Sequence, residues 1–306
     1  MSEARHAFFE GKIVPFKDAN ISIATHALNY GTAVFGGLRG YWNDAQKKLF
    51  IFRPLEHYRR FLRSAHMMVI DLPHTPESLT QLSIDLLKAD HWMQDIYLRP
   101  LAYKAELGIG VRLHDLRNEL SMFAVPMGAY GKNEDGAHVT VSSWRRVDDN
   151  VIPARGKISG AYVNSALMKT DAIRAGFDEA LALDHNGHIS EGSAMNIFMV
   201  RDGVLITPPV TDNILEGITR RSIIELAREE LGLTVLERSI DRSEVFICDE
   251  FFMTGTAAQV TVVTKVDHRS VGDGAMGPIT AKIRKVFNDV AHGKHAKYQH
   301  WNVPVE

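Results

Sequence analysis

The sequence contains one cysteine, Cys248, among 306 residues, which excludes an intrachain disulfide and makes a cysteine-based zinc site hard to build. No apolar run approaches the roughly 18 residues that cross a bilayer, and no apolar signal segment follows the first residues. The formal charge is −2, from 35 basic and 37 acidic residues, without the positive excess that binds nucleic-acid phosphates. These absences predict a cytoplasmic protein with neither a membrane nor a nucleic-acid partner.

Several catalytic signatures are also missing. The 14 histidines are scattered, with no His-x₃-His pair and no His-Glu-x-x-His, so the spacing predicts no metal site. There is no Gly-x-Ser-x-Gly elbow, no P-loop ending in Gly-Lys-Ser/Thr, and no Gly-x-Gly-x-x-Gly opening a helix after an N-terminal strand. Hydrolase, NTPase and nicotinamide-dependent functions therefore lose their main support.

The length predicts about two domains. We expect a small α+β domain over 1–128, with a helix over 54–70 that carries apolar residues at spacings of three and four. Residues 128–136 include three glycines and almost no apolar side chain, which is typical of a linker, and we expect the linker over 129–137. The second and larger domain is then 138–306.

Turn signals mark the second domain. Asn186-Gly187 and Asp202-Gly203 are strong hairpin turns between apolar runs. We expect helices over 162–175 and 280–291, and a strand-rich stretch over 245–263. The sequence shows no internal repeat.

Four features in the second half of the sequence could take part in catalysis or bind a ligand. Lys157 lies in a glycine-flanked loop, and Glu191 follows the first hairpin. Residues 215–220 open a helix and 253–258 end a strand, and both segments are rich in small residues that leave N–H groups open to an anion. Each feature alone is weak, because a loop lysine is commonly solvated and a turn acid is commonly structural. Together they supply an amine, an acid for a ring nitrogen and two anion sites, which pyridoxal phosphate (PLP) chemistry needs.

At this point the chain resembles the fold-type IV (class IV) PLP aminotransferases, most closely the branched-chain amino acid aminotransferases. The resemblance implies an α+β fold in which a small N-terminal domain is joined by a short linker to a larger, barrel-like PLP domain. The matching runs, in the family's order, are His26–Thr32, Val34–Arg39, Glu56–Arg60, Tyr97–Pro100, Lys157–Tyr162, Ile189–Gly192, Leu215–Arg220 and Thr254–Ala258.

The resemblance assigns the cofactor residues. Lys157 is expected to bond the cofactor aldehyde and later to move a proton, and Glu191 to pair with the pyridine nitrogen. Tyr162 matches the tyrosine that hydrogen-bonds the phenolic oxygen, and Leu215 matches the residue that packs on the ring. The expected phosphate site and its surroundings comprise Arg60, Gly217, Ile218, Thr219 and Thr256.

The resemblance also implies a substrate site. Tyr97 and the N–H groups of Thr256, Ala257 and Ala258 would bind the α-carboxylate, supported by Arg99 and Tyr30. The walls of the side-chain pocket, suited to Leu, Ile and Val, would be Phe35, Gly37 and Tyr130. The run 108–111 resembles a loop that enters the partner's active site, which implies a homodimer. The implied reaction moves the amino group of a branched-chain amino acid to 2-oxoglutarate.

Two positions depart from the family pattern. Gly36 stands where a glutamate is common, and Ala194-Met195-Asn196 replaces a common Gly-Glu-Asn. Both changes remove a carboxylate near the substrate entrance, which leaves activity on (R)-amines as an alternative. Activity on D-amino acids is a further alternative, although such an enzyme would lack the Tyr97-Leu98-Arg99 pattern. A catalytically silent PLP-binding protein is a third alternative, from a different functional class.

Overall fold

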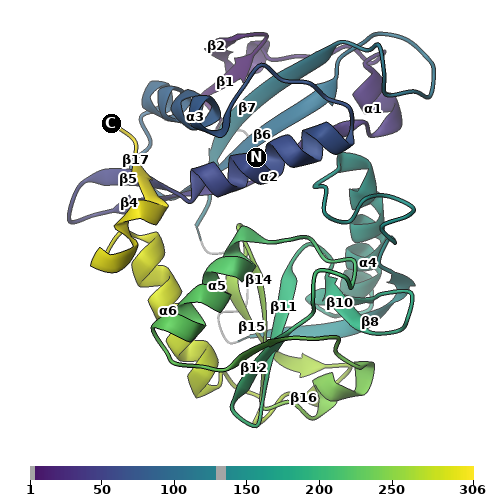
Figure 1. Cartoon of the computed structure of the whole chain (residues 1–306), viewed down its shortest axis with the longest axis vertical. Coiled ribbons are helices and arrows are strands. Elements are labelled where there is room, and N and C mark those ends of the chain that lie inside the picture. The colour runs from purple at the N-terminus through teal and green to yellow at the C-terminus, as the bar shows by residue number, and fades with distance from the viewer. Residues whose placement is uncertain (1–3, 129–135) are drawn as a thin grey trace. The chain divides into compact units, whose positions relative to one another are not determined.

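The computed structural model describes residues 4–128 and 136–306 and divides into two compact units (Figure 1). Unit 1 contains the chain up to Gly128, together with Gly156–Ala161 and Asp289–Glu306. Unit 2 contains the described residues up to Arg155 and then Tyr162–Asn288. Two stretches of the expected second domain thus pack with the N-terminal residues, and the predicted linker lies mostly outside the described residues.

The sheet of unit 1 is antiparallel throughout its described pairs, in the order β17-β5-β4-β6-β7-β1-β2, with β3 paired to β6. Its strands are β1 (His6–Phe9), β2 (Lys12–Pro15), β3 (Ala33–Phe35), β4 (Leu38–Asn43), β5 (Lys48–Phe52), β6 (Ile96–Lys104), β7 (Asn118–Pro126) and β17 (Asn302–Pro304). Its helices are α1 (His26–Tyr30), α2 (Pro54–Met67) and α3 (Pro76–Asp90), with 3-10 turns over Phe16–Asp18, Ser159–Ala161 and Ala296–Trp301.

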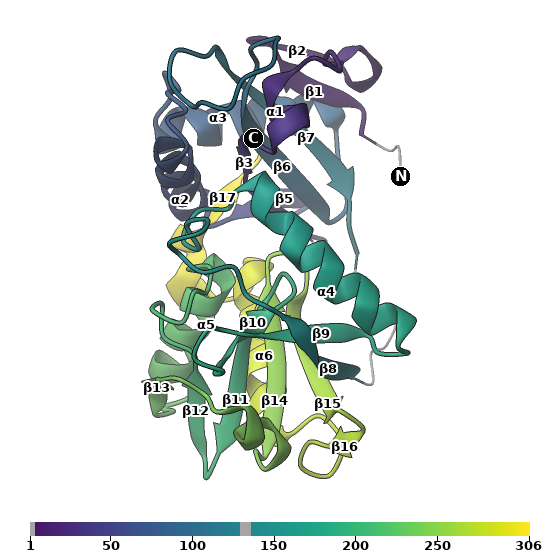
Figure 2. The same cartoon turned by 90° about the vertical axis from the view of Figure 1, so that its right-hand side faces the viewer.

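The sequence explains why the two long helices of unit 1, α2 and α3, form where they do. On α2, Tyr58, Phe61 and Ala65 recur at spacings of three and four and are buried, as the predicted helix requires. At the start of α3, Thr75 Oγ1 accepts a hydrogen bond from Ser78 N, and Ser78 Oγ accepts one from Thr75 N. Figure 2 shows α2 and α3 together on one face of the sheet.

Unit 2 is built on a mixed sheet in the order β10-β9-β8-β15-β14-β11-β12-β13, with β16 paired to β15. Its strands are β8 (Ala137–Arg145), β9 (Glu179–Leu183), β10 (Ile189–Gly192), β11 (Asn196–Arg201), β12 (Val204–Thr207), β13 (Val235–Glu237), β14 (Glu250–Gly255), β15 (Gln259–Val266) and β16 (Arg269–Ser270). Only Ser193–Met195 separate β10 from β11, although four other strands lie between them in the sheet order, so the sheet curls into a half-barrel.

The helices of unit 2 are α4 (Tyr162–Arg174), α5 (Ile218–Glu229) and α6 (Pro278–Ala291), of which residues 278–288 belong to this unit. Figure 2 shows α4 in front of the sheet and α6 behind it. Both predicted hairpins are confirmed, because β9 pairs with β10 and β11 with β12 in antiparallel register. The strand-rich reading of 245–263 is wrong at its start, where Arg242–Phe246 form a 3-10 turn and Glu244 Oε1 accepts a hydrogen bond from Asp241 N.

Two further expectations concern export and disulfides. No helix among residues 4–128 and 136–306 combines the length and apolar character needed to span a membrane. Cys248 is free and buried, and burial raises the pKa of its thiol to about 12. The thiol is therefore held in its unreactive, protonated form.

Candidate active site

The loop that carries Lys157 is fixed within unit 1 by its backbone. Lys157 N donates to Ser64 Oγ at 3.1 Å, and Lys157 O accepts from Phe35 N at 3.0 Å. Ile158 forms a β-bridge with Val34, and Gly160 N donates to Gly31 O at 3.1 Å. These four backbone contacts fix the position of the loop, although the surrounding sequence is rich in glycine. The Lys157 side chain therefore extends from a defined position in unit 1.

Ser64 also connects the lysine loop to Arg60. Ser64 Oγ, which accepts from Lys157 N, donates to Arg60 O at 3.0 Å. Residues four apart lie on the same face of a helix, so Arg60 and Ser64 face one side of α2. The structure thus brings the expected phosphate-binding arginine within one helical turn of the residue that holds Lys157.

Two cationic side chains lie close to the Phe35 ring. Lys157 Nζ is 4.9 Å from the ring centroid, and Arg99 Cζ is 4.5 Å from it. Phe35 itself is buried, at 8% exposure. A cation over an aromatic face is attracted by the ring quadrupole, so Phe35 positions both groups in addition to lining the site.

Tyr97 and Arg99 lie on the same face of β6, where Arg99 Nη2 donates to Tyr97 Oη at 3.2 Å. Arg99 Nε is buried and has no hydrogen-bond partner among the described residues. An ideal Cβ on Gly37 would lie only 2.0 Å from Tyr97 Oη, so only glycine leaves the tyrosine in this position. A phenol and an incompletely satisfied guanidinium in this arrangement are suited to a carboxylate.

Tyr30 and His26 hold the exposed loop over residues 108–111. Tyr30 Oη accepts from Gly110 N at 3.2 Å, and His26 Nε2 lies 2.8 Å from Gly110 O. The loop exposes two large apolar side chains almost completely, Ile109 at 97% and Val111 at 89%. The structure therefore links Tyr30 to this loop and leaves the apolar tip of the loop uncovered within the chain.

In unit 2, Glu191 lies on β10 and is 4% exposed. Its Oε1 lies 2.9 Å from Arg146 Nε, and its Oε2 accepts from Leu215 N at 3.1 Å and from Asn196 Nδ2 at 3.3 Å. The buried carboxylate is thus both paired and hydrogen-bonded, which offsets the cost of burying its charge.

Asn196 joins Glu191 to the start of α5. Asn196 Nδ2 also donates to Leu215 O at 2.9 Å, and a Cβ on Gly217 would meet Asn196 Oδ1 at 2.0 Å. Gly217 is the N-cap of α5 and provides no side-chain cap. The first N–H groups of a helix have no intrahelical acceptor, so those of Ile218 and Thr219 are suited to an anion.

The structure also places the remaining expected residues of unit 2. Tyr162 opens α4, and Thr256, Ala257 and Ala258 form the turn between β14 and β15. Tyr130 lies outside the described residues. Each unit therefore carries its own group of expected residues. Unit 1 holds Tyr30, Phe35, Gly37, Arg60, Tyr97, Arg99 and Lys157, and unit 2 holds Tyr162, Glu191, Leu215, Gly217, Ile218, Thr219, Thr256, Ala257 and Ala258.

Sequence reasoning missed Ser64, Arg146 and Asn196, which position Lys157 and Glu191. A serine four residues after Arg60 is a weak signal of this kind. No local pattern marks Arg146 or Asn196, because their partners come from distant segments.

Three comparisons with known proteins agree that this chain is similar to aminotransferases. A family model described as amino-transferase class IV matches residues 34–266. A curated protein of Aquifex aeolicus, named a probable branched-chain-amino-acid aminotransferase, is 44% identical over 98% of this chain and 96% of its own length.

Two solved structures superpose over nearly the whole chain. The branched-chain aminotransferase of Thermoproteus uzoniensis, solved with norvaline, gives a TM-score of 0.95 at 39% identity and covers 99% of this chain and 100% of its own. The branched-chain amino acid aminotransferase of Thermobaculum terrenum, solved in its PLP (holo) form, gives 0.94 at 36% identity and covers both chains completely, at 100% each.

Proposed function

Because the chain belongs to the class IV aminotransferases, we propose that it transfers amino groups between L-branched-chain amino acids and 2-oxoglutarate, with PLP as its cofactor. The observation that carries the proposal is the position of Lys157, whose backbone is bonded on one side to Ser64 and on the other to Phe35. Relatives named for this activity cover nearly the whole chain, which supports the same substrate class.

Each unit, taken by itself, carries groups of the kind that bind this cofactor. In unit 1, Arg60 supplies a fixed positive charge, and in unit 2 the uncapped start of α5 supplies N–H groups; both kinds of group bind phosphate. Glu191 supplies a buried carboxylate for a protonated ring nitrogen. A bulkier residue at 217 would displace Asn196, so the glycine keeps the entrance to this helix end open.

When bound, the cofactor supplies an aldehyde that an amine can attack and a ring that withdraws electrons from the substrate Cα. Lys157 Nζ would be the nucleophile that holds the aldehyde, and the same nitrogen would act as the base that takes the proton from the substrate Cα. A positioned base of this kind typically contributes about 10²–10⁴-fold in rate. The loop contacts of Lys157 matter because proton transfer needs its nitrogen at a fixed distance from the substrate.

Glu191 keeps the ring nitrogen protonated by holding a negative charge beside it. The guanidinium of Arg146, 2.9 Å from Oε1, favours the ionised carboxylate, and the hydrogen bonds from Asn196 and Leu215 favour it further. These contacts fix the direction of the carboxylate as well as its charge.

Tyr97 and Arg99 bind the substrate α-carboxylate. The Tyr97 hydroxyl donates to it and is oriented by Arg99 Nη2, while the unpartnered Nε adds positive charge to the site. Two groups that recognise a carboxylate, next to an aromatic wall at Phe35, suit an amino acid with an apolar side chain.

The structure gives no extra room at Gly36 for a bulky amine donor. A Cβ at this position would lie 2.6 Å from Pro100 Cγ, so the Pro100 ring occupies the space into which a side chain at position 36 would extend. This observation favours L-branched-chain amino acids over the (R)-amines that the missing carboxylate left open.

The half-reaction with single donors tests the proposal. The holoenzyme is mixed with L-leucine, L-valine, D-alanine or an (R)-arylalkylamine, and conversion of the cofactor is followed by its absorbance. We expect L-leucine and L-valine to react fastest and D-alanine slowest. A faster reaction with D-alanine or the (R)-amine would overturn the substrate assignment.

We also propose a homodimer that works in the cytoplasm. The apolar tip at Ile109 and Val111 is nearly fully exposed in one chain, and such surface is commonly covered by a second copy. The free and buried thiol of Cys248 suits a reducing compartment.

A further inference from the structure

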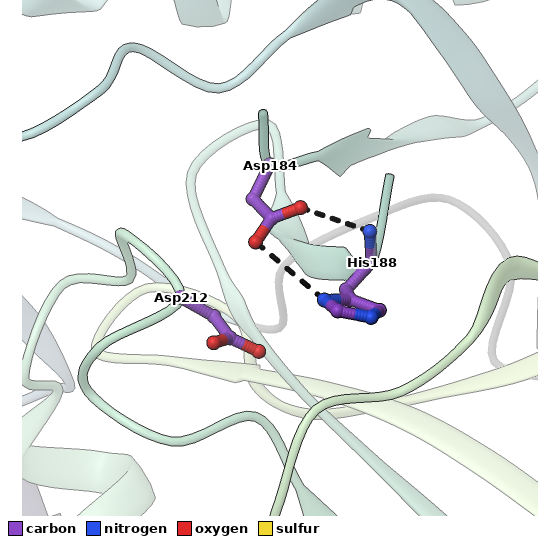
Figure 3. A group of neighbouring side chains, drawn as sticks. All are labelled: Asp184, His188 and Asp212. Carbon is purple, nitrogen blue, oxygen red and sulfur yellow. Dashed lines mark hydrogen bonds and ion pairs between the residues drawn. The ribbon is translucent and has the colours of Figure 1, made fainter. Parts of the chain in front are cut away.

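A second group of ligand-type side chains lies in unit 2, outside the proposed active site. Asp184 and His188 flank the turn between β9 and β10, and Asp212 comes from the loop between β12 and α5 (Figure 3). One ligand atom from each of the three residues lies within 4.8 Å of the other two. We propose that Asp184, His188 and Asp212 bind one divalent transition-metal ion of the Zn²⁺ type.

Asp184 is held so that one of its oxygens faces the group. It is 1% exposed, and its Oδ1 accepts from the backbone N–H groups of Asn186 and His188, both at 2.9 Å. Its Oδ2 lies 3.8 Å from His188 Nδ1. The turn backbone therefore fixes the carboxylate without using the oxygen that points toward His188.

Asp212 provides the strongest indication that this group of side chains binds a cation. It is 7% exposed, and its Oδ2 is buried without a hydrogen-bond partner among the described residues. Figure 3 shows its carboxylate directed toward His188 and Asp184. Leaving a buried carboxylate oxygen unpaired is costly, and a bound cation would remove that cost.

The ring of His188 is arranged as metal-binding histidines usually are. Its Nδ1 is buried and without a hydrogen-bond partner among the described residues, while its Nε2 lies 3.5 Å from Asp241 Oδ1. A ligating histidine typically donates its other N–H to a carboxylate, which fixes the tautomer and strengthens the ligand. The Asp241 carboxylate lies on the Nε2 side of the ring and would favour the tautomer that leaves the Nδ1 lone pair available to a metal ion.

The donor set selects the class of ion. Imidazole suits Zn²⁺ and its neighbours in the first transition row, whereas Mg²⁺ and Ca²⁺ prefer oxygen ligands alone. Ligand atoms around tetrahedral Zn²⁺ lie about 3.3 Å apart at bond lengths of about 2.0 Å, so the three side chains need only draw closer by small rotations. Water would complete the coordination.

The ion would connect two segments that reach the proposed active site. Ser190 Oγ donates to Asp212 O at 2.6 Å, and one residue further along β10 Glu191 accepts from Leu215 N. A metal bond between His188 and Asp212 would reinforce this pairing of β10 with the loop before α5. The site would be structural, because none of its ligands belongs to the group around Lys157 or Glu191.

Zinc titration of the holoenzyme by calorimetry tests the proposal, after dialysis against a chelator and in phosphate-free buffer. We expect one equivalent of Zn²⁺ to bind, no comparable binding of Mg²⁺, and a rise of a few degrees in Tm with saturating Zn²⁺. Asp212→Asn keeps the size of the side chain and removes its charge, and His188→Ala removes the nitrogen ligand. Each should weaken Zn²⁺ binding at least about tenfold and abolish the rise in Tm.

His185→Ala is the matched control. His185 lies in the same turn, but its ring faces Asp148 at 3.5 Å and is 57% exposed, so its loss should leave zinc binding unchanged. The retained cofactor absorbance of each variant shows that it is folded. Absence of one-equivalent zinc binding in the wild-type protein would overturn the proposal. So would unchanged binding in both Asp212→Asn and His188→Ala.

Discussion

Arg146 Nε lies 2.9 Å from Glu191 Oε1, and the two side chains are 10% and 5% exposed. The pair joins the end of β8 to β10, two segments that are far apart in the sequence. Arg146 also donates to Asn213 O at 3.2 Å, so it anchors the loop before α5 as well as the carboxylate. The acid assigned to the ring nitrogen therefore depends on a positioning residue that makes no expected contact with the cofactor.

Replacing Arg146 tests this dependence. Arg146→Met removes the guanidinium that lies 2.9 Å from the buried Glu191 carboxylate, which should lower the free energy of unfolding by about 3 kcal/mol. We also expect the absorbance maximum of the bound cofactor to move, because the charge facing the ring nitrogen changes. Denaturant unfolding and absorbance spectra of the holoenzyme provide the two measurements.

Arg155→Met is the control for this change. Arg155 is 39% exposed and pairs with Asp149 and Glu216 at 3.3 and 3.5 Å, so its loss should cost less than about 1 kcal/mol. Equal effects of the two substitutions on stability and spectrum would contradict the importance given to the Arg146–Glu191 pair.

Gly37→Ala should damage substrate binding rather than the cofactor site. The added Cβ would lie 2.0 Å from Tyr97 Oη, so the tyrosine must move away from the expected α-carboxylate position. We expect kcat/KM for L-leucine to fall by about 10²-fold, with cofactor affinity little changed. Gly128→Ala is the control, since its Cβ would meet no atom within 4 Å. An unchanged kcat/KM in Gly37→Ala would show that Tyr97 does not bind substrate.

A charge at the tip of the 108–111 loop should dissociate the proposed dimer. Ile109 is 97% exposed and Val111 is 89% exposed, so a carboxylate costs nothing in the isolated chain but is unfavourable in an apolar interface. We expect Ile109→Asp to sediment as a monomer at concentrations where the wild-type protein is dimeric. Met93→Asp, at 75% exposure elsewhere on unit 1, serves as the control. A wild-type monomer, or a dimer unaffected by Ile109→Asp, would contradict the proposal.

Glu244 should make stability depend on acid pH. Hydrogen bonds from Arg238, which outweigh the opposing effect of burial, lower the pKa of Glu244 from 4.5 to about 2. Because the folded pKa is depressed, its stabilisation is fully present above pH 4.5 and is lost as the pH falls toward 2. The difference in unfolding free energy between wild type and Glu244→Gln should therefore be constant near neutral pH and shrink below about pH 4.5. Urea unfolding at several pH values measures it, and a difference independent of pH would contradict the assignment.

Local patterns predicted much of the fold. The turn at Asn186-Gly187 and the helix predicted over 54–70 depend on nearby residues alone, and the structure confirms both, with the helix ending at Met67. By contrast, β17 pairs Asn302 with Phe52, and nothing near Asn302 marks it as a strand. The packing of Gly156–Ala161 with unit 1 was missed for the same reason, since its hydrogen-bond partners Gly31, Phe35 and Ser64 come from the first part of the chain.

The residues of the candidate site also fall into two groups, those that motifs in the sequence predicted and those that they did not. Lys157 and Glu191 were predicted because an ordered set of motifs carries them, and their chemistry remains to be tested. Arg146, Asn196 and Ser64 could not be predicted, because a side chain that positions another is defined by distances in space. The Asp184–His188–Asp212 group contains one histidine and joins two segments of the chain, so no regular histidine spacing marks it in the sequence.

The proposed function requires a covalent bond between Lys157 and the cofactor. Borohydride reduction of the holoenzyme, followed by proteolysis and mass spectrometry, locates the bond directly. We expect the reduced cofactor on the peptide that contains Lys157, and no labelled peptide and no transamination in Lys157→Ala, whereas Lys282→Ala on the exposed face of α6 should behave as wild type. Cofactor attached to another lysine, or an unlabelled wild-type protein, would contradict the account.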